Sequence, residues 1–212
     1  MEQESRTVST GTCLVCGAVH SKTGMGRHLI ACRAKQIASA GASGARARVF
    51  HLAIEGHGDP EYWLHLEIRA DASLAALDRY LREIWLECCG HLSAFEIEGR
   101  QRRMGTPVER VLRPGLRFRH AYDFGSTTHL ALRVVAERES VLHGDIELLA
   151  RNEPPDIRCG VCGETATQVC TACLYEPDGW LCDTCVEEHE HGEDYVLPVV
   201  NSPRVGVCGY AG

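Results

Sequence analysis

The chain has 212 residues, of which 44% are hydrophobic and 24% are charged, as in an ordinary globular protein. No apolar run approaches the roughly 20 residues of a membrane span, and the polar first residues lack a secretory signal, so we expect a cytoplasmic protein with no membrane contact. Its twelve cysteines, many in Cys-x-x-Cys pairs, then favour metal binding over disulfides.

The net charge of −7 is unevenly distributed along the chain. Residues 1–48 carry +5, residues 49–150 carry −4 and residues 151–212 carry −8. Small flexible residues at 38–45 and a Pro-Pro pair within 153–156 are typical of linkers. We therefore predict three domains: an N-terminal finger at 10–37, a central domain at 48–150 and a Cys/His-rich module at 157–212.

The first domain contains four metal-ligand residues at zinc-finger spacing, which are Cys13, Cys16, His28 and Cys32. Two thiolates on a tight turn, followed by a His and a Cys four residues apart on one helix face, form a tetrahedral zinc site. Since so short a segment buries little core, zinc would supply its folding free energy. The spacing predicts one zinc in this domain.

Nucleic-acid binding by the finger is a separate hypothesis. If the helix begins near Ser21, the base-reading positions fall on Ser21, Gly24 and Arg27, and Met25 takes a core position. Gly24 cannot read a base, and one finger covers about three base pairs. Basic side chains could instead contact phosphates without choosing a sequence, and the candidates are Lys22, Arg27, Arg33 and Lys35. The alternative is a structural or protein-binding finger.

The central region predicts an α+β domain with a mixed sheet and one main helix. Apolar and polar residues alternate at 48–55 and 62–69, as they do in half-buried strands. A glycine-serine pair at 125–126 predicts a hairpin. Further strands are expected at 92–97, 116–124, 127–135 and 146–149.

The main helix is predicted by apolar residues at helical spacing from Leu74 to Cys88, before a stop at Gly90. On this pattern Cys88 belongs to the helix core. Cys89 is then a neighbouring thiol without a partner in register. Neither cysteine is predicted to be a ligand or an activated nucleophile.

An enzyme of unknown reaction is the alternative for this domain, with a site among His65, His91, Asp123 and His129. Asp123 lies in an Asp-Phe-Gly sequence like that of protein kinases, but the other kinase motifs are absent. We therefore interpret Asp123 as a residue that stabilises a turn. Seven arginines between Arg100 and Arg119 form a basic stretch that could face phosphates.

The third domain offers eight candidate ligands within 33 residues, at Cys159, Cys162, Cys170, Cys173, Cys182, Cys185, His189 and His191. Three regular Cys-x-x-Cys pairs followed by histidines predict two structural zinc ions, and three in the whole chain. The spacing implies no vacant ligand position, so we do not expect catalytic zinc. Cys208 competes with His191 as the eighth ligand, and His191 is favoured because it lies closer in sequence.

The order of these ligands resembles B-box and other cross-brace fingers, in which alternate pairs share a metal. The resemblance implies that Cys159, Cys162, Cys182 and Cys185 hold one zinc and that Cys170, Cys173 and His189 hold the other. Sequential grouping of the first four and last four ligands is the alternative. His189 and His191 diverge on a regular helix, so both can reach one metal only if the helix ends, as Gly192 would allow.

Several central segments resemble the plasmid pRiA4b ORF-3-like family, which also appears as passenger, TnpR-type proteins of insertion elements. They are residues 63–68, the helix at 74–85, residues 91–97 and above all Tyr122-Asp-Phe-Gly-Ser-Thr-Thr-His129. The closing residues 197–210 resemble the tail of zinc-bearing members. The resemblance implies an α+β fold and association with mobile elements, and it implies no known reaction.

The leading hypothesis is a non-enzymatic, zinc-binding interaction protein of a prokaryotic cytoplasm. Its basic finger could bind nucleic acid, whereas a module of charge −8 is suited to a protein partner. A pure protein-docking adaptor is the further alternative.

Overall fold

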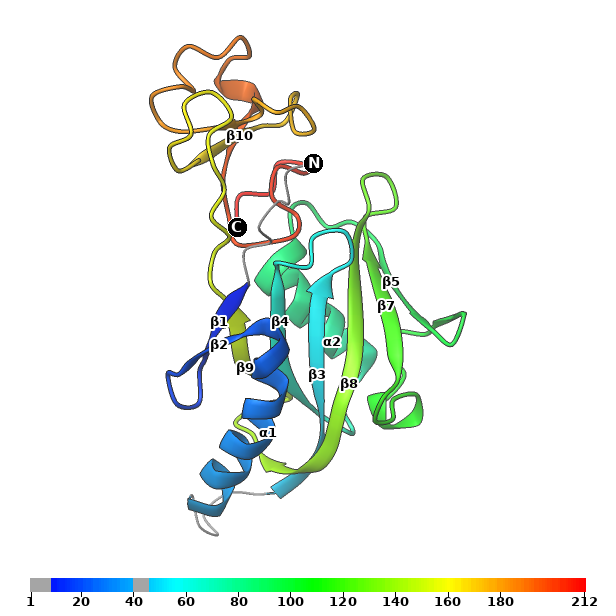
Figure 1. Cartoon of the computed structure of the whole chain (residues 1–212). Coiled ribbons are helices and arrows are strands. Elements are labelled where there is room, and N and C mark those ends of the chain that lie inside the picture. The colour runs from blue at the N-terminus through cyan, green and yellow to red at the C-terminus, as the bar shows by residue number, and fades with distance from the viewer. Residues whose placement is uncertain (1–8, 40–45) are drawn as a thin grey trace, which may run out of the picture.

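The computed structural model describes residues 9–39 and 46–212, so residues 40–45 of the predicted linker lie outside the described residues. The described chain forms a large antiparallel sheet with a helix on each face and a separate small sheet (Figure 1). The strands are β1 (Thr10–Cys13), β2 (Val19–Ser21), β3 (Arg46–Gly56), β4 (Trp63–Arg69), β5 (Ser93–Ile97), β6 (Arg100–Arg102), β7 (Arg117–Tyr122), β8 (Thr128–Val141), β9 (Ile146–Asn152), β10 (Gln168–Cys170), β11 (Trp180–Leu181) and β12 (Val196–Pro198). The helices are α1 (Lys22–Ser39) and α2 (Leu74–Leu81), which continues as a π-helical turn over Arg82–Leu86, and short 3₁₀ turns lie at Val108–Arg110 and Glu193–Tyr195.

The large sheet has nine strands in the order β2-β1-β9-β4-β3-β8-β7-β5-β6. The structure is mostly sheet with two helices, which agrees with the α+β prediction in outline. The predicted mixed sheet is wrong, because every described strand pair of this sheet is antiparallel. Neighbours such as β3–β4 and β7–β8 follow each other in the chain through short connections that reverse its direction. Neither described helix is long and apolar enough to cross a membrane.

One face of the sheet carries the main core, against α2. Alternation along β3 and β4 places Phe50, Leu52, Leu64 and Leu66 on this face, and all four side chains are buried. Leu74, Leu77, Leu81 and Trp85 on α2 and its π turn complete the core. Ser73 caps the helix by accepting a hydrogen bond from the Ala76 N–H.

The opposite face packs against α1, so the N-terminal finger is joined to the central domain rather than separate from it (Figure 1). Met25 and Leu29 of α1 are fully buried against Trp63 of β4. Strand β1 also pairs with β9, so the finger extends the large sheet. Gly11 permits this close approach, since a Cβ there would lie 2.4 Å from the Arg151 carbonyl oxygen and 2.6 Å from the Trp63 ring.

The third predicted domain divides into two parts. Residues 157–198 form a small loop-rich module around the three-stranded sheet β11-β10-β12, which Figure 1 shows beyond the end of the large sheet. Residues 199–212 return to the central domain. There the Ser202 hydroxyl donates to the Trp85 carbonyl at 2.6 Å, and Val205 joins the main core.

The small module depends on close backbone contacts at glycine. A Cβ at Gly179 would lie 1.9 Å from the Cys173 carbonyl oxygen, whereas a Cβ at Gly192 would meet nothing within 4 Å. We expect Gly179→Ala to lower the opening free energy of the module by about 1–3 kcal/mol through overpacking. Hydrogen exchange of amides in 168–181 measures the change, and Gly192→Ala is the matched control. Equal exchange in the two variants would contradict the prediction.

Candidate metal centres

The structure brings together the four predicted ligands of the finger. The ligand atoms of Cys13, Cys16, His28 and Cys32 all lie within 4.8 Å of one another. Cys13 ends β1, and the Gly17 N–H donates to its carbonyl oxygen at 2.7 Å in a turn where Gly17 has a φ of 74°. His28 and Cys32 project from one face of α1, with His28 Nε2 3.4 Å from Cys16 Sγ.

The predicted phosphate-binding residues of the finger have different surroundings. The prediction for Arg33 is wrong, because its side chain is 3% exposed and pairs with Glu67 at 3.1 Å and Glu147 at 2.6 Å. Lys22 pairs with Glu55 at 2.5 Å and donates to the Pro60 carbonyl. Arg27 and Lys35 are exposed.

The small module gathers its ligands into two groups. One contains Cys159, Cys162, Cys182 and Cys185, and the other contains Cys170, Cys173, His189 and His191. These are alternate pairs, as the cross-brace resemblance implies, and the structure places His191 rather than Cys208 in the second group. His191 Nδ1 lies 3.3 Å from Cys173 Sγ and 3.6 Å from Cys170 Sγ.

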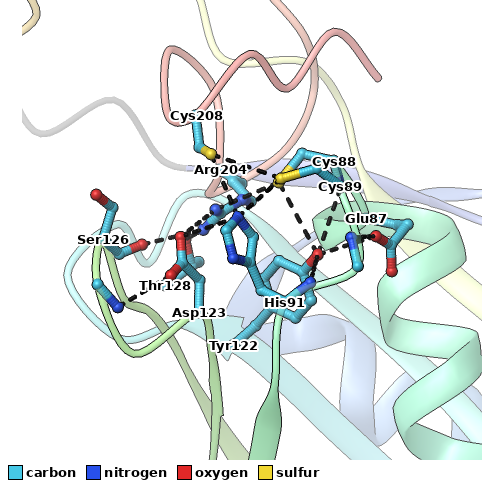
Figure 2. A network of polar contacts seen from close by, with 12 residues as sticks. Glu87, Cys88, Cys89, His91, Tyr122, Asp123, Ser126, Thr128, Arg204 and Cys208 are labelled. Carbon is cyan, nitrogen blue, oxygen red and sulfur yellow. Dashed lines mark hydrogen bonds and ion pairs between the residues drawn. The ribbon is translucent and has the colours of Figure 1, made fainter.

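A fourth group of ligand atoms, which we call the 88–208 cluster, consists of Cys88, Cys89, His91 and Cys208 (Figure 2). Cys89 Sγ lies 3.7 Å from Cys88 Sγ and 3.9 Å from Cys208 Sγ. His91 Nε2 lies 2.9 Å from Cys89 Sγ and 3.3 Å from Cys208 Sγ. The prediction that Cys88 and Cys89 lie in the helix, away from other ligand residues, is therefore wrong, because both follow the helical turn and lie beside His91 and Cys208.

The helix ends earlier than its apolar pattern predicts, which is why these cysteines meet. After the π turn, Glu87 is extended, with a φ of −70° and a ψ of 115°. Its carboxylate accepts the Gly90 N–H at 2.5 Å, and Gly90 has a φ of 81° that turns the chain back toward Cys89. The Tyr122 hydroxyl, which donates to Glu87 at 3.0 Å, accepts the N–H of His91 at 3.3 Å.

Arg204 connects the 88–208 cluster to the turn that contains Asp123 (Figure 2). It is fully buried and donates to Asp123 Oδ2 at 2.8 Å, to Thr128 Oγ1 at 2.9 Å and to Cys88 Sγ at 3.4 Å. Hydrogen bonds from Arg204 and then from the Gly125 N–H hold the pKa of Asp123 below its usual value. Asp123 therefore does stabilise a turn, and it also fixes the closing segment.

The residues of the alternative enzyme site lie in different places. His91 and Asp123 approach to 3.5 Å, but His65 is buried and hydrogen-bonded to His51 at 2.9 Å. The exposed His129 instead faces His57, with ring centroids 6.4 Å apart. The four candidate residues do not form one pocket in the described structure.

The buried pair His51 and His65 predicts a dependence of stability on pH. Burial, with nearby positive charge, lowers the pKa of His65 to about 4 and that of His51 to about 2. Below pH ~6.5 the unfolded imidazoles bind protons that the native ones do not, so the free energy of unfolding must fall as the pH falls from 6.5 toward 4. Two such groups contribute a loss of about 2–3 kcal/mol between pH 7 and 5.5.

Urea unfolding at several pH values tests this expectation. His51→Leu/His65→Leu should remove the extra loss, whereas His129→Gln, at an exposed histidine, should retain it. All three proteins keep the same cysteine clusters, so acid release of metal cancels in the comparison. Parallel pH profiles for the double variant and the parent protein would contradict the prediction.

Comparisons with known proteins give little further information. No family model matches the chain, and no curated protein matches it. A solved structure of a protein of unknown function from Methanosarcina mazei Go1 aligns with a TM-score of 0.42 and 15% sequence identity. The alignment covers 49% of this chain and 67% of that chain. At that TM-score it adds no functional information.

Proposed function

We propose that the chain is a non-enzymatic, zinc-binding interaction protein that docks a protein partner through residues 157–198. The observation that carries this proposal is the pair of four-ligand groups in the small module. Because protein side chains supply four ligands in each group, no position is left for a substrate, as in structural zinc sites. The Cys/His composition favours zinc over hard cations, which prefer oxygen ligands.

The surface of this module supports protein docking. Tyr175 is 93% exposed, and Val161 and Tyr195 are also exposed although they are large and apolar. The region 151–212 carries eleven acidic residues against three basic ones, which disfavours contact with nucleic acid. Exposed aromatic side chains are common anchors in protein interfaces.

We also propose, on the motif residues at 122–129 and 197–210, that the chain is a member of the pRiA4b ORF-3-like family and that its partner is a protein of a mobile element.

A photo-crosslinking residue at Tyr175 tests the docking surface, with the same residue at the exposed Leu14 of the finger as the control. In extract of the source organism, we expect one defined protein adduct from position 175 and none from position 14. Cys185→Ser, which disrupts one ligand group, should abolish the adduct. Identical adducts from both positions, or no adduct at 175, would refute this function.

Nucleic-acid binding is a second candidate, favoured by a groove of about 1130 Å³ between α1 and the sheet. Arg27, Arg117, Arg119 and Arg133 line it, and in the described residues none of these four forms an ion pair with an acidic side chain. Glu55, Glu96 and Glu98 line the groove as well, but Lys22 and the four arginines outnumber them. An excess of positive charge along one groove is typical of a phosphate-binding surface. The groove would thus use the sheet face as well as the finger.

Fluorescence anisotropy with duplex DNA over a salt series tests this candidate. Each lost phosphate contact should reduce the slope of log K against log salt by about 0.9, so replacing three groove arginines by Gln should reduce it by roughly 2–3. Arginines away from the groove provide a charge-matched triple control. The groove variant replaces Arg117, Arg119 and Arg133, and the control replaces the exposed Arg79, Arg103 and Arg110. Equal slopes for the groove variant and the control variant would exclude the groove as the DNA-binding surface.

A further inference from the structure

We propose that the 88–208 cluster is a fourth zinc site, which fastens the closing segment 199–212 to the central domain. The inference is independent of partner docking by the small module. It rests on the geometry of four ligand atoms and on the contacts of the segment that supplies the last one.

The distances fit a tetrahedral site. With Zn–S bonds of about 2.3 Å and a Zn–N bond of about 2.0 Å, the edges of a tetrahedron are about 3.8 Å between sulfurs and about 3.5 Å between sulfur and nitrogen. The two sulfur separations measured from Cys89 are 3.7 and 3.9 Å. His91 Nε2 lies 3.3 Å from Cys208 Sγ, close to the second edge, and 2.9 Å from Cys89 Sγ, about 0.6 Å inside it. A disulfide would need sulfurs about 2.05 Å apart.

The backbone around the cluster holds the ligands in this position. Cys208 has a φ of 52°, between Gly206 at 74° and Gly209 at 71°, so the chain makes a tight turn that presents the thiol. On the other side, Gly90 turns the chain so that Cys89 and His91 face the same point. A glycine with positive φ thus follows Cys89 and Cys208, as Gly17 follows Cys16 in the finger and Gly163 follows Cys162 in the small module.

Charge and hydrogen bonding around the cluster also favour a bound metal. Three thiolates and a neutral imidazole around Zn²⁺ carry a net charge of −1, and binding releases three thiol protons to solvent. The buried Arg204 donates to Cys88 Sγ at 3.4 Å, which is the outer hydrogen bond that a metal-bound thiolate accepts. Asp123 Oδ2 accepts from Arg204 and lies 3.5 Å from His91 Nε2, farther than the sulfurs of Cys89 at 2.9 Å and Cys208 at 3.3 Å.

The site would join parts of the chain that are far apart in sequence. Three ligands follow α2, and the fourth lies more than a hundred residues later, in the segment that also inserts Val205 into the main core. Cys89 and Cys208 are exposed, whereas the other groups each contain a buried cysteine. We therefore expect this metal to be released to a chelator before the others.

Metal analysis of the full-length protein, loaded with zinc under reducing conditions and desalted, tests the proposal. We expect four zinc ions per chain, and three in Cys89→Ser and in Cys208→Ser. His143→Gln, at an exposed histidine outside the groups, should keep four. In the two serine variants, exchange of amides in 202–210 should accelerate roughly a hundredfold when free zinc stands at 100 times the dissociation constant.

Unchanged exchange in β3 and β8 shows that each variant is folded. Three zinc ions in the parent protein, or four in both serine variants, would overturn the fourth site. An intact mass of the parent protein two hydrogens below that of the fully reduced chain would also overturn it, because it indicates a disulfide. A count of three with the Tyr175 adduct preserved would leave the proposed docking function standing. A count of four zinc ions without that adduct would support the fourth site and refute the docking function.

Discussion

Arg33→Met is expected to lower the free energy of unfolding of the metal-loaded protein by about 3 kcal/mol or more. Glu67 in β4 is fully buried, and its carboxylate accepts hydrogen bonds from Arg33 at 3.1 Å, Ser140 at 2.8 Å and Arg138 at 2.5 Å. Loss of Arg33 leaves that buried charge with one cation, which is partly exposed. Removing one partner from a buried pair is costly because the other charge stays desolvated.

Arg48→Met is the control for this prediction. Arg48 pairs with Glu137 and Glu109 on the surface, where its side chain is 47% exposed, and the loss of an exposed pair costs about 0–1 kcal/mol. Urea unfolding monitored by tryptophan fluorescence measures both variants. Arg33 lies in the finger helix and Glu67 in the central sheet. We therefore expect Arg33→Met to lower the urea midpoint of unfolding for both regions together. Equal losses in the two variants would show that the buried pair does not couple them.

The sequence predicted those parts of the structure whose signal is local. Alternation at 48–55 and 62–69 corresponds to β3 and β4, because successive side chains of a strand point to opposite faces of the sheet. The expectation of a half-buried strand is wrong for β4, whose polar residues His65 and Glu67 are also buried. Regular Cys-x-x-Cys spacing identified three of the four ligand groups, since each pair is a single tight turn. The packing of the finger on Trp63 had no such signal, because it depends on contacts between distant segments.

The 88–208 cluster was missed for two physical reasons. Apolar residues continue at helical spacing as far as Cys88, but the chain leaves the helix after Leu86, where the Glu87 carboxylate and the Tyr122 hydroxyl bind backbone N–H groups of the next turn. The fourth ligand, Cys208, comes from the far end of the sequence, so no spacing rule joins it to Cys89. The sequence Cys-Cys-Gly-His at 88–91 was the available signal, since its glycine permits a turn between ligands.

Metal removal is expected to have the largest effect of all, because residues 157–198 bury very little apart from their cysteines. The other buried apolar side chains there are Ala166, Val169 and Leu181, and Leu174, Trp180 and Leu197 are partly buried. Each contributes at most about 3 kcal/mol, whereas ordering each residue's backbone costs roughly 1–2 kcal/mol. Structural zinc supplies about 10–16 kcal/mol per site in small domains. Without metal, this balance is strongly unfavourable, so the module should unfold.

A high-affinity zinc chelator with reductant, followed by hydrogen exchange, should therefore remove protection from β10, β11 and β12 while β3, β4 and β8 keep theirs. The finger should respond less than the small module, because Met25, Leu29 and the Arg33–Glu67 pair hold α1 on the sheet without metal. Chelator already saturated with zinc is the control. Simultaneous loss across all strands would mean that the metals stabilise the whole chain as one unit, and no loss would mean that the ligand groups do not hold the module. The ordering expected here follows from the contacts that remain when the metal is removed, which are many for the finger helix and few for the small module.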